Sequence, residues 1–251
     1  MTSKPEEEHK ANLIIDVGNT LTKLAVFNNN KQTHSEKVSR LSEQVIERLV
    51  TEHHIKKTIV SAVGEFPAYI AEFIAQHTPL LQFNHTTPLP IKNCYKTPNT
   101  LGPDRLAAAV GANTLHPNTN VLCIDSGTAI TYDLVTADGQ YLGGAISPGI
   151  EMRFKALNHF TAKLPLVSFN IPTLVVGNTT ETSILSGVLN GVLGEVDRYI
   201  DSISAQYSPL NVVFTGGNSF FFDKKLKNSI FVHPNLVLFG LNRILNYNEN
   251  I

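Results

Sequence analysis

The chain has 251 residues, of which 42% are hydrophobic and 16% charged, and its formal net charge is −1. This is the composition of an ordinary folded protein with room for one large or two medium domains, so global disorder is excluded. The balance of 20 basic and 21 acidic residues, without a long basic block, argues against nucleic acid or a membrane surface as partner, because both attract concentrated positive charge.

The first residues are polar and include three consecutive glutamates, Glu6, Glu7 and Glu8. We expect residues 1–11 to form a disordered tail rather than a signal peptide, because an apolar segment is missing there. No apolar run approaches the roughly 20 residues that span a bilayer. The two cysteines, Cys94 and Cys123, lack metal-ligand spacing, so we expect free thiols and a cytoplasmic protein.

The first half of the chain reads as three strands followed by alternating helices and strands. Apolar runs and turn residues predict strands at 12–16, 21–27, 34–38, 58–63 and 80–83. Helical spacing of apolar residues predicts helices at 41–53 and 67–76, and an Ala-rich helix opens at Gly102-Pro103-Asp104 and runs to about Leu115.

The same plan begins again after a turn cluster at 116–120. Strands are predicted at 121–125, 129–135, 140–146 and 211–215, and helices at 150–160, 181–206 and 237–247. Self-similarity over half the chain predicts two related half-domains, 12–117 and 118–251, in an α/β fold with mixed sheets flanked by helices.

Each half contains an acidic residue at a strand end, followed by a Gly/Thr turn. The first is Asp16-Val17-Gly18-Asn19-Thr20 and the second is Asp125-Ser126-Gly127-Thr128. Such a turn presents backbone N–H groups and a hydroxyl to a phosphate, and the acid can hold Mg²⁺ directly or through water. One such turn is equally well a plain hairpin. Two copies, each after a buried strand, favour a pair of phosphate turns around a polyphosphate.

Three further segments each have two interpretations. Asp104 and Arg105 open a helix either as a cap with a solvated arginine, or as a general base and an anion clamp. The glycines of 143–149 and of 216–217 mark either tight corners or backbone that a ligand approaches closely. The threonines of 179–182 are either helix caps or ligand contacts.

Together, Asp16-Val17-Gly18-Asn19-Thr20, Leu101-Gly102-Pro103-Asp104-Arg105, the segment Asp125 to Thr131 and the segment Gly143 to Gly149 resemble type III pantothenate kinases. That family belongs to the acetate kinase/sugar kinase/Hsp70/actin superfamily, whose half-domains are ribonuclease H-like. The resemblance runs from about Asn12 to Gly217. It implies ATP-dependent phosphorylation of pantothenate, the first step of coenzyme A synthesis, with Mg²⁺ and with K⁺ or NH₄⁺, by a homodimer whose substrate pocket is completed across the interface.

The resemblance also implies roles for individual residues. Asp104 is the proton acceptor, Asp125 a monovalent-cation ligand, and Asp16 a Mg²⁺ ligand through water. ATP contacts map to Asp16, Val17, Gly18, Asn19, Thr20, Leu21, Thr22, Lys23 and Thr128. Pantothenate contacts map to Tyr95, Gly102, Pro103, Asp104, Arg105 and Thr180, with Thr179 and Thr182 as neighbouring alternatives.

Three rival functions remain at this point. Another small-molecule kinase of the superfamily would use the same turns. A binding or regulatory protein would keep the ATP turns without catalysis, although both Asp104 and Arg105 are present. A ribonuclease H-type nuclease would gather Asp16, Asp104, Asp125 and Asp133 around two metals, but it would have no use for two Gly/Thr turns.

Overall fold

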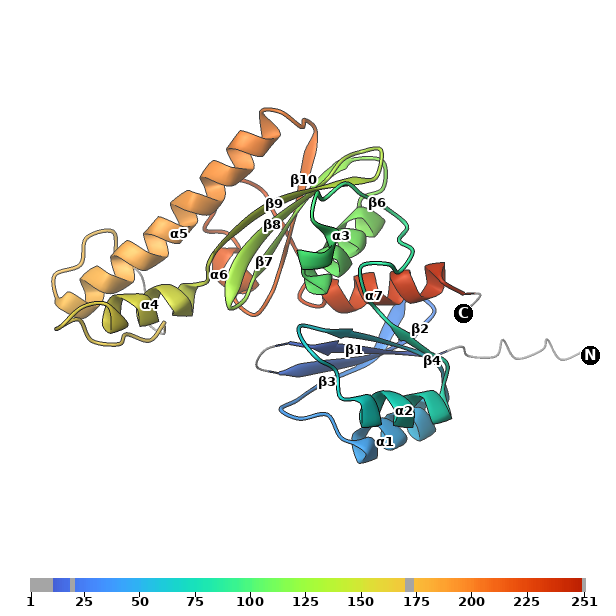
Figure 1. Cartoon of the computed structure of the whole chain (residues 1–251). Helices are drawn as coiled ribbons and strands as arrows, with labels where there is room; N and C mark the ends of the chain where they lie inside the picture. Colours follow the sequence, from blue (N-terminus) through green and yellow to red (C-terminus); the bar gives the residue numbers. More distant parts are fainter. Residues whose placement is uncertain (1–10, 19–20, 170–173, 250–251) are drawn as a thin grey trace, which may run out of the picture. The chain divides into compact units, whose positions relative to one another are not determined.

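The computed structural model describes residues 11–18, 21–169 and 174–249 (Figure 1). Asn19, Thr20 and all of the expected tail except Ala11 lie outside the described residues. The chain forms two compact units, which we call unit 1 (Met1–Thr114 with Leu236–Ile251) and unit 2 (Leu115–Asn235).

Unit 1 is built on a mixed sheet whose strand order is β3-β2-β1-β4-β5. The pairs β1–β2 and β2–β3 are antiparallel, whereas β1–β4 and β4–β5 are parallel. The strands of this sheet are β1 (Ala11–Val17), β2 (Thr22–Asn28), β3 (Lys31–Val38), β4 (Ile55–Ala62) and β5 (Leu80–Gln82); the short β6 (Lys92–Asn93) is not part of it. The helices are α1 (Glu43–His53), α2 (Ala68–His77), the 3-10 turn η1 (Pro98–Thr100), α3 (Pro103–Leu115) and α7 (Leu236–Tyr247).

The two faces of this sheet are covered by different helices. Leu13 and Ile15 of β1 point toward α1 and α2 and form the apolar core there. Because strand side chains alternate, Asn12 and Asp16 point to the opposite face. That face is covered by α7, where the Asn12 amide donates to Asn242 Oδ1 at 2.9 Å (Figure 1). The alternation therefore buries Asp16 on the α7 side of the sheet.

Five strands of the second sheet repeat this topology in unit 2, in the order β9-β8-β7-β10-β11. Again the first two pairings are antiparallel and the last two parallel. The elements are β7 (Asn120–Ser126), β8 (Ala129–Val135), β9 (Gln140–Pro148), α4 (Ile150–His159), α5 (Thr180–Ser204), β10 (Leu210–Thr215), α6 (Ser219–Phe222) and β11 (Phe231–Val232). The helices α4 and α5 cover one face, where Leu122, Ile124 and Tyr132 meet Val188 and Val192.

The predicted fold class is confirmed by this architecture, but one boundary needs correction. The sequence placed 118–251 in one half-domain, whereas the last helix belongs to unit 1. The reason is packing: Gly240 of α7 lies so close to the Ala107 carbonyl of α3 that an added Cβ would sit 1.8 Å from it. The sequence also missed β6, α6 and β11, since elements of two to four residues show no periodicity. Ala11 belongs to β1 and not to a tail.

Candidate active site

Asp16 is the centre of a row of polar side chains across the sheet of unit 1. Strand register places Lys23 of β2 on one side of it and Ser61 of β4 on the other. Asp16 is only 6% exposed. Burial raises the pKa of its carboxyl to about 6, an effect that Lys23 opposes and nearby Asp104 reinforces. The site is therefore short of positive charge.

Asp104 and Arg105 stand in the first turn of α3, in the same unit as Asp16. The Arg105 backbone N–H donates to Asp104 Oδ1 at 2.9 Å, so Asp104 does serve the helix start as the capping interpretation required. Arg105, however, is 6% exposed, and its guanidinium lies 5.7 Å from the centre of the Tyr95 ring. The alternative of a solvated arginine is thus wrong. Glycine at 102 leaves room for the Asp104 carboxylate, which an added Cβ would meet at 2.5 Å.

The predicted site residues of unit 1 are therefore brought together in two groups. Asp16 is coupled electrostatically to Lys23 and Asp104. Tyr95 and Arg105 form a cation–π pair, and Arg105 directly follows Asp104 in the chain. In the first Gly/Thr turn, residues 16–23, which we call turn 1, Gly18 donates its N–H to the Leu21 carbonyl at 3.1 Å and closes the turn. Val17 ends β1, Thr22 begins β2 and Pro103 begins α3, whereas Asn19 and Thr20 lie outside the described residues.

Asp125 and Thr128 belong to the corresponding turn of unit 2, residues 125–128, which we call turn 2. Register sets Asp125 between Thr131 of β8 and Thr215 of β10. Two glycines pack on this turn: an added Cβ on Gly149 would lie 2.3 Å from the Gly127 carbonyl, and one on Gly216 would lie 2.4 Å from Asp125 Oδ1. These glycines are needed for close packing of the unit's own backbone, which supports the tight-corner interpretation of both segments.

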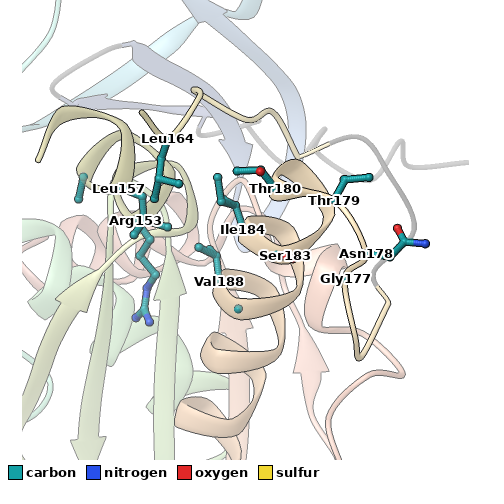
Figure 2. Close-up of a pocket in the computed structure, with 12 residues that line it drawn as sticks. Arg153, Leu157, Leu164, Gly177, Asn178, Thr179, Thr180, Ser183, Ile184 and Val188 are labelled. Carbon is teal, nitrogen blue, oxygen red and sulfur yellow. The ribbon is translucent and has the colours of Figure 1, made fainter. Parts of the chain in front are cut away.

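Thr180 is the first residue of α5 and lines a cavity of about 1120 Å³ in unit 2. Thr179 caps the helix, and Thr182 completes a capping box, so these two hydroxyls are already engaged. Figure 2 shows Thr180 and Ile184 on α5 facing Leu164, while Asn178 points away. Of the three threonines considered, Thr180 lines the cavity and takes no part in the capping box.

Sequence reasoning missed two features near these residues. Ser61 shares the Asp16 row but carries no motif of its own. The second is a polar network under the cavity of unit 2: Arg153 donates to Glu195 Oε2 at 2.7 Å, and the Tyr132 hydroxyl donates to Glu195 Oε1 at 3.0 Å. Although burial opposes it, hydrogen bonding from Arg153 lowers the pKa of Glu195. Residues more than 40 positions apart cannot be paired from one sequence.

The carboxylates fit a nucleotide-bound Mg²⁺ better than an all-protein metal centre. Among residues 11–18, 21–169 and 174–249, no three His, Cys, Asp or Glu side chains gather as metal ligands. Asp133, the fourth acid of the nuclease alternative, is fully buried and accepts a hydrogen bond from the Tyr141 hydroxyl at 2.7 Å. Mg²⁺ commonly uses one or two carboxylates plus substrate phosphates, and the buried carboxylate of Asp16 is able to supply one of them.

Two mixed sheets of one repeated topology, each with an acid at the same strand position, define an actin-like α/β fold. Solved structures agree. A Campylobacter jejuni protein described as a Baf family transcriptional activator matches with a TM-score of 0.63 at 20% identity, covering 95% of this chain and 100% of that one. A glucokinase from an Antarctic psychrotroph matches with a TM-score of 0.56 at 14% identity, covering 96% and 100%.

The particular family follows from sequence comparison. The family model of type III pantothenate kinase matches residues 12–202. The chain is 46% identical to a type III pantothenate kinase of Phocaeicola vulgatus over 96% of this chain and 100% of the relative, and 45% identical to that of Christiangramia forsetii over 95% and 99%. The chain belongs to the type III pantothenate kinase family and is a kinase.

Proposed function

We propose that this chain transfers the γ-phosphoryl group of ATP to the primary hydroxyl of pantothenate. The observation that carries the proposal is the juxtaposition of Asp16 and Asp104 in unit 1, beside the buried Arg105. Phosphoryl transfer needs charge neutralisation, an aligned alcohol and a modest base, and it needs no covalent enzyme intermediate. Asp16 would serve charge neutralisation through Mg²⁺, Arg105 would align the alcohol substrate, and Asp104 would be the base.

Each residue then has one role. Asp104 accepts the proton of the attacking hydroxyl as the new P–O bond forms and the bond between the γ-phosphorus and the ADP oxygen breaks. Arg105, held against Tyr95, binds the pantothenate carboxylate, with Gly102 and Pro103 shaping the pocket. Turn 1, from Asp16 to Lys23, binds the ATP phosphates through backbone N–H groups and the Lys23 ammonium.

Two cations complete the proposal. Mg²⁺, held by Asp16 through water, would neutralise charge on the ATP phosphates during transfer. In unit 2, Asp125 would bind K⁺ or NH₄⁺ and Thr128 would contact ATP. The surroundings of Asp125 support a weakly held monovalent ion, because its register neighbours Thr131 and Thr215 offer hydroxyl oxygens and no further charge.

We also propose a homodimer formed through the α4–α5 side of unit 2. Large apolar side chains are exposed there: Phe160 is 81% exposed, Val175 84% and Val176 80%. Such a patch on a folded unit marks an interaction surface. The adjoining cavity is lined by Leu157 and Ile184 and ends at Thr180, which would reach the pantothenate pocket of the partner copy. The substitution Val175→Glu places a charge in this patch, so we expect the variant to sediment as a monomer in analytical ultracentrifugation. Its KM for pantothenate should be higher than that of wild type.

The proposed compartment is the cytoplasm. Both cysteines are free thiols, as expected in a reducing compartment. Burial raises the pKa of the Cys123 thiol, which makes that thiol unreactive. No helix of the described residues is long and apolar enough to cross a membrane.

The test is ADP release measured in a coupled assay with pantothenate, sugars or acetate as acceptor, each in Na⁺ and in K⁺. We expect turnover with pantothenate alone, stimulated by K⁺ or NH₄⁺. Turnover with a sugar or acetate instead would reassign the acceptor to another small-molecule kinase of the superfamily. Equal rates in Na⁺ and K⁺ would contradict the assignment of Asp125 as a ligand of K⁺ or NH₄⁺.

A further inference from the structure

Ser61 is a fully buried hydroxyl without a hydrogen-bond partner among the described residues. Its relative exposure is 0%, and Oγ bonds to no described atom. An unpaired buried polar group is destabilising, and native proteins contain few of them. Ser126 and Ser219 share this property, but Ser61 is the one of the three that stands beside a carboxylate in strand register.

The geometry places Ser61 within reach of Asp16. The two residues are partners in the parallel pair β1–β4, so their side chains leave the same face of the sheet from strands about 4.8 Å apart. Lys57, four residues earlier on β4, bonds the Glu249 carbonyl next to α7, which confirms that this face of β4 is the α7 face. At this strand spacing, a serine Oγ and an aspartate carboxylate on the same face are close enough for a hydrogen bond in a suitable χ1 rotamer.

Two other buried hydroxyls in comparable strand positions do have hydrogen-bond partners. Thr58, on the same strand and equally buried, shares a hydrogen bond of 2.7 Å with Thr78. Thr215 takes the position of Ser61 in unit 2, beside Asp125, and its hydroxyl donates to the Pro234 carbonyl at 3.4 Å. The strand position and the burial therefore do not by themselves leave a hydroxyl unbonded.

We propose that Ser61 is a positioning residue that donates a hydrogen bond to the Asp16 carboxylate when Asp16 holds Mg²⁺·ATP. This inference rests on the proposed function, since it assigns Asp16 to that complex. A carboxylate has about four acceptor sites, and those that the cation's water shell does not take need donors to fix its orientation. On one side of Asp16 the register neighbour is Lys23, whose ammonium group is a donor. On the other side the register neighbour is Ser61, whose hydroxyl is the available donor.

The experiment compares Ser61→Ala with Thr58→Val. Binding of Mg²⁺·ATP is measured by calorimetry without pantothenate, and melting temperature is measured without ligand. For Ser61→Ala we expect about tenfold weaker Mg²⁺·ATP binding, a raised Mg²⁺ requirement for turnover, an unchanged KM for pantothenate and a melting temperature no lower than wild type. For Thr58→Val we expect a lower melting temperature and unchanged Mg²⁺·ATP binding.

Two outcomes overturn the inference. One is wild-type Mg²⁺·ATP binding by Ser61→Ala; the other is parallel loss of melting temperature and binding, as a purely structural residue would show. Ser61→Cys, which keeps a weaker donor of similar size, should give an intermediate affinity. In an Asp16→Asn background, Ser61→Ala should have no further effect on Mg²⁺·ATP binding. Because binding is measured without an acceptor, a wrong acceptor assignment appears only in the ADP assay and leaves this result interpretable.

Discussion

Turn 1 of unit 1 and turn 2 of unit 2 occupy the same place in the same strand topology, yet their surroundings differ. Asp16 and Asp125 are each the sixth residue of their central strand. Asp16 lies between Lys23 and Ser61, whereas Asp125 lies between Thr131 and Thr215. The repeated fold thus supplies two equivalent carboxylates, and their register neighbours distinguish them.

The difference in neighbours favours different ligands. Lys23 provides a cation beside Asp16, which suits the phosphates that accompany Mg²⁺. Around Asp125 the neighbours are hydroxyls, and turn 2 is closed more tightly, with Gly127 bonded to the Ala129 carbonyl at 2.9 Å. A single carboxylate surrounded by neutral hydroxyl oxygens suits a monovalent cation better than a divalent one. Under the proposed function, the two equivalent carboxylates of the duplicated fold bind different cations because their register neighbours differ.

The largest expected effect concerns Asp104, which is coupled electrostatically to Asp16. Replacing it by asparagine removes the proposed proton acceptor while leaving the helix start capped. We expect kcat to fall by about 10²- to 10⁴-fold with ATP binding retained. Pre-steady-state ADP release and calorimetric ATP binding measure the two quantities. Normal turnover by Asp104→Asn would refute the base assignment.

The second prediction separates the two turns directly. Asp125→Asn should raise the K⁺ concentration for half-activation by about 100-fold, since a lost ligand costs at least as much as a lost supporting contact. Asp16→Asn is the matched control, because it makes the same chemical change at the equivalent strand position. That variant should mainly weaken Mg²⁺·ATP binding. If both variants shifted the K⁺ and Mg²⁺ dependences equally, the two sites would not be distinct.

The third prediction follows from the raised pKa of Asp16. Its folded-state pKa of about 6 lies above the ordinary value of 3.8, so the folded state binds the proton more tightly than the unfolded state. The contribution of this group to the free energy of unfolding is therefore highest below pH 4 and declines as the pH rises to about 6. Asp16→Asn should be more stable than wild type at pH 7 to 8 by about 2 to 3 kcal/mol, a gain that vanishes near pH 4.

Thermal melts from pH 4 to 8 test this prediction. Adding Mg²⁺·ATP should narrow the difference in melting temperature between wild type and Asp16→Asn at pH 7, because the cation offsets the charge of the buried carboxylate. A pH-independent difference between the two proteins would contradict the assigned titration.

The smallest effect concerns the backbone that supports turn 2. Gly149→Ala places a Cβ against the Gly127 and Thr128 carbonyls and should lower the free energy of unfolding by about 1 to 3 kcal/mol. Gly217→Ala is the control: the position is exposed, and an added Cβ there meets no described atom within 4 Å. It should stay within about 0.5 kcal/mol of wild type. Chemical denaturation measures both, and equal losses would show that turn 2 is not held by this contact.

The sequence alone determined the repeated plan and the acids at its strand ends. Apolar periodicity and Gly/Thr turns are local signals, so β8 (Ala129–Val135) was predicted at its observed bounds and α3 was predicted from its Ala-rich run. The same local signals located Asp16, Asp104 and Asp125 as candidates.

Only the tertiary structure decided which of these residues share a site and what surrounds them. The burial of Arg105 against Tyr95, the packing of α7 on unit 1 and the unbonded Ser61 beside Asp16 depend on strand register and helix packing. Those contacts join residues far apart in the chain, and a single sequence carries no periodic signal for them. The sequence therefore located the acids, and the fold assigned each acid its neighbours.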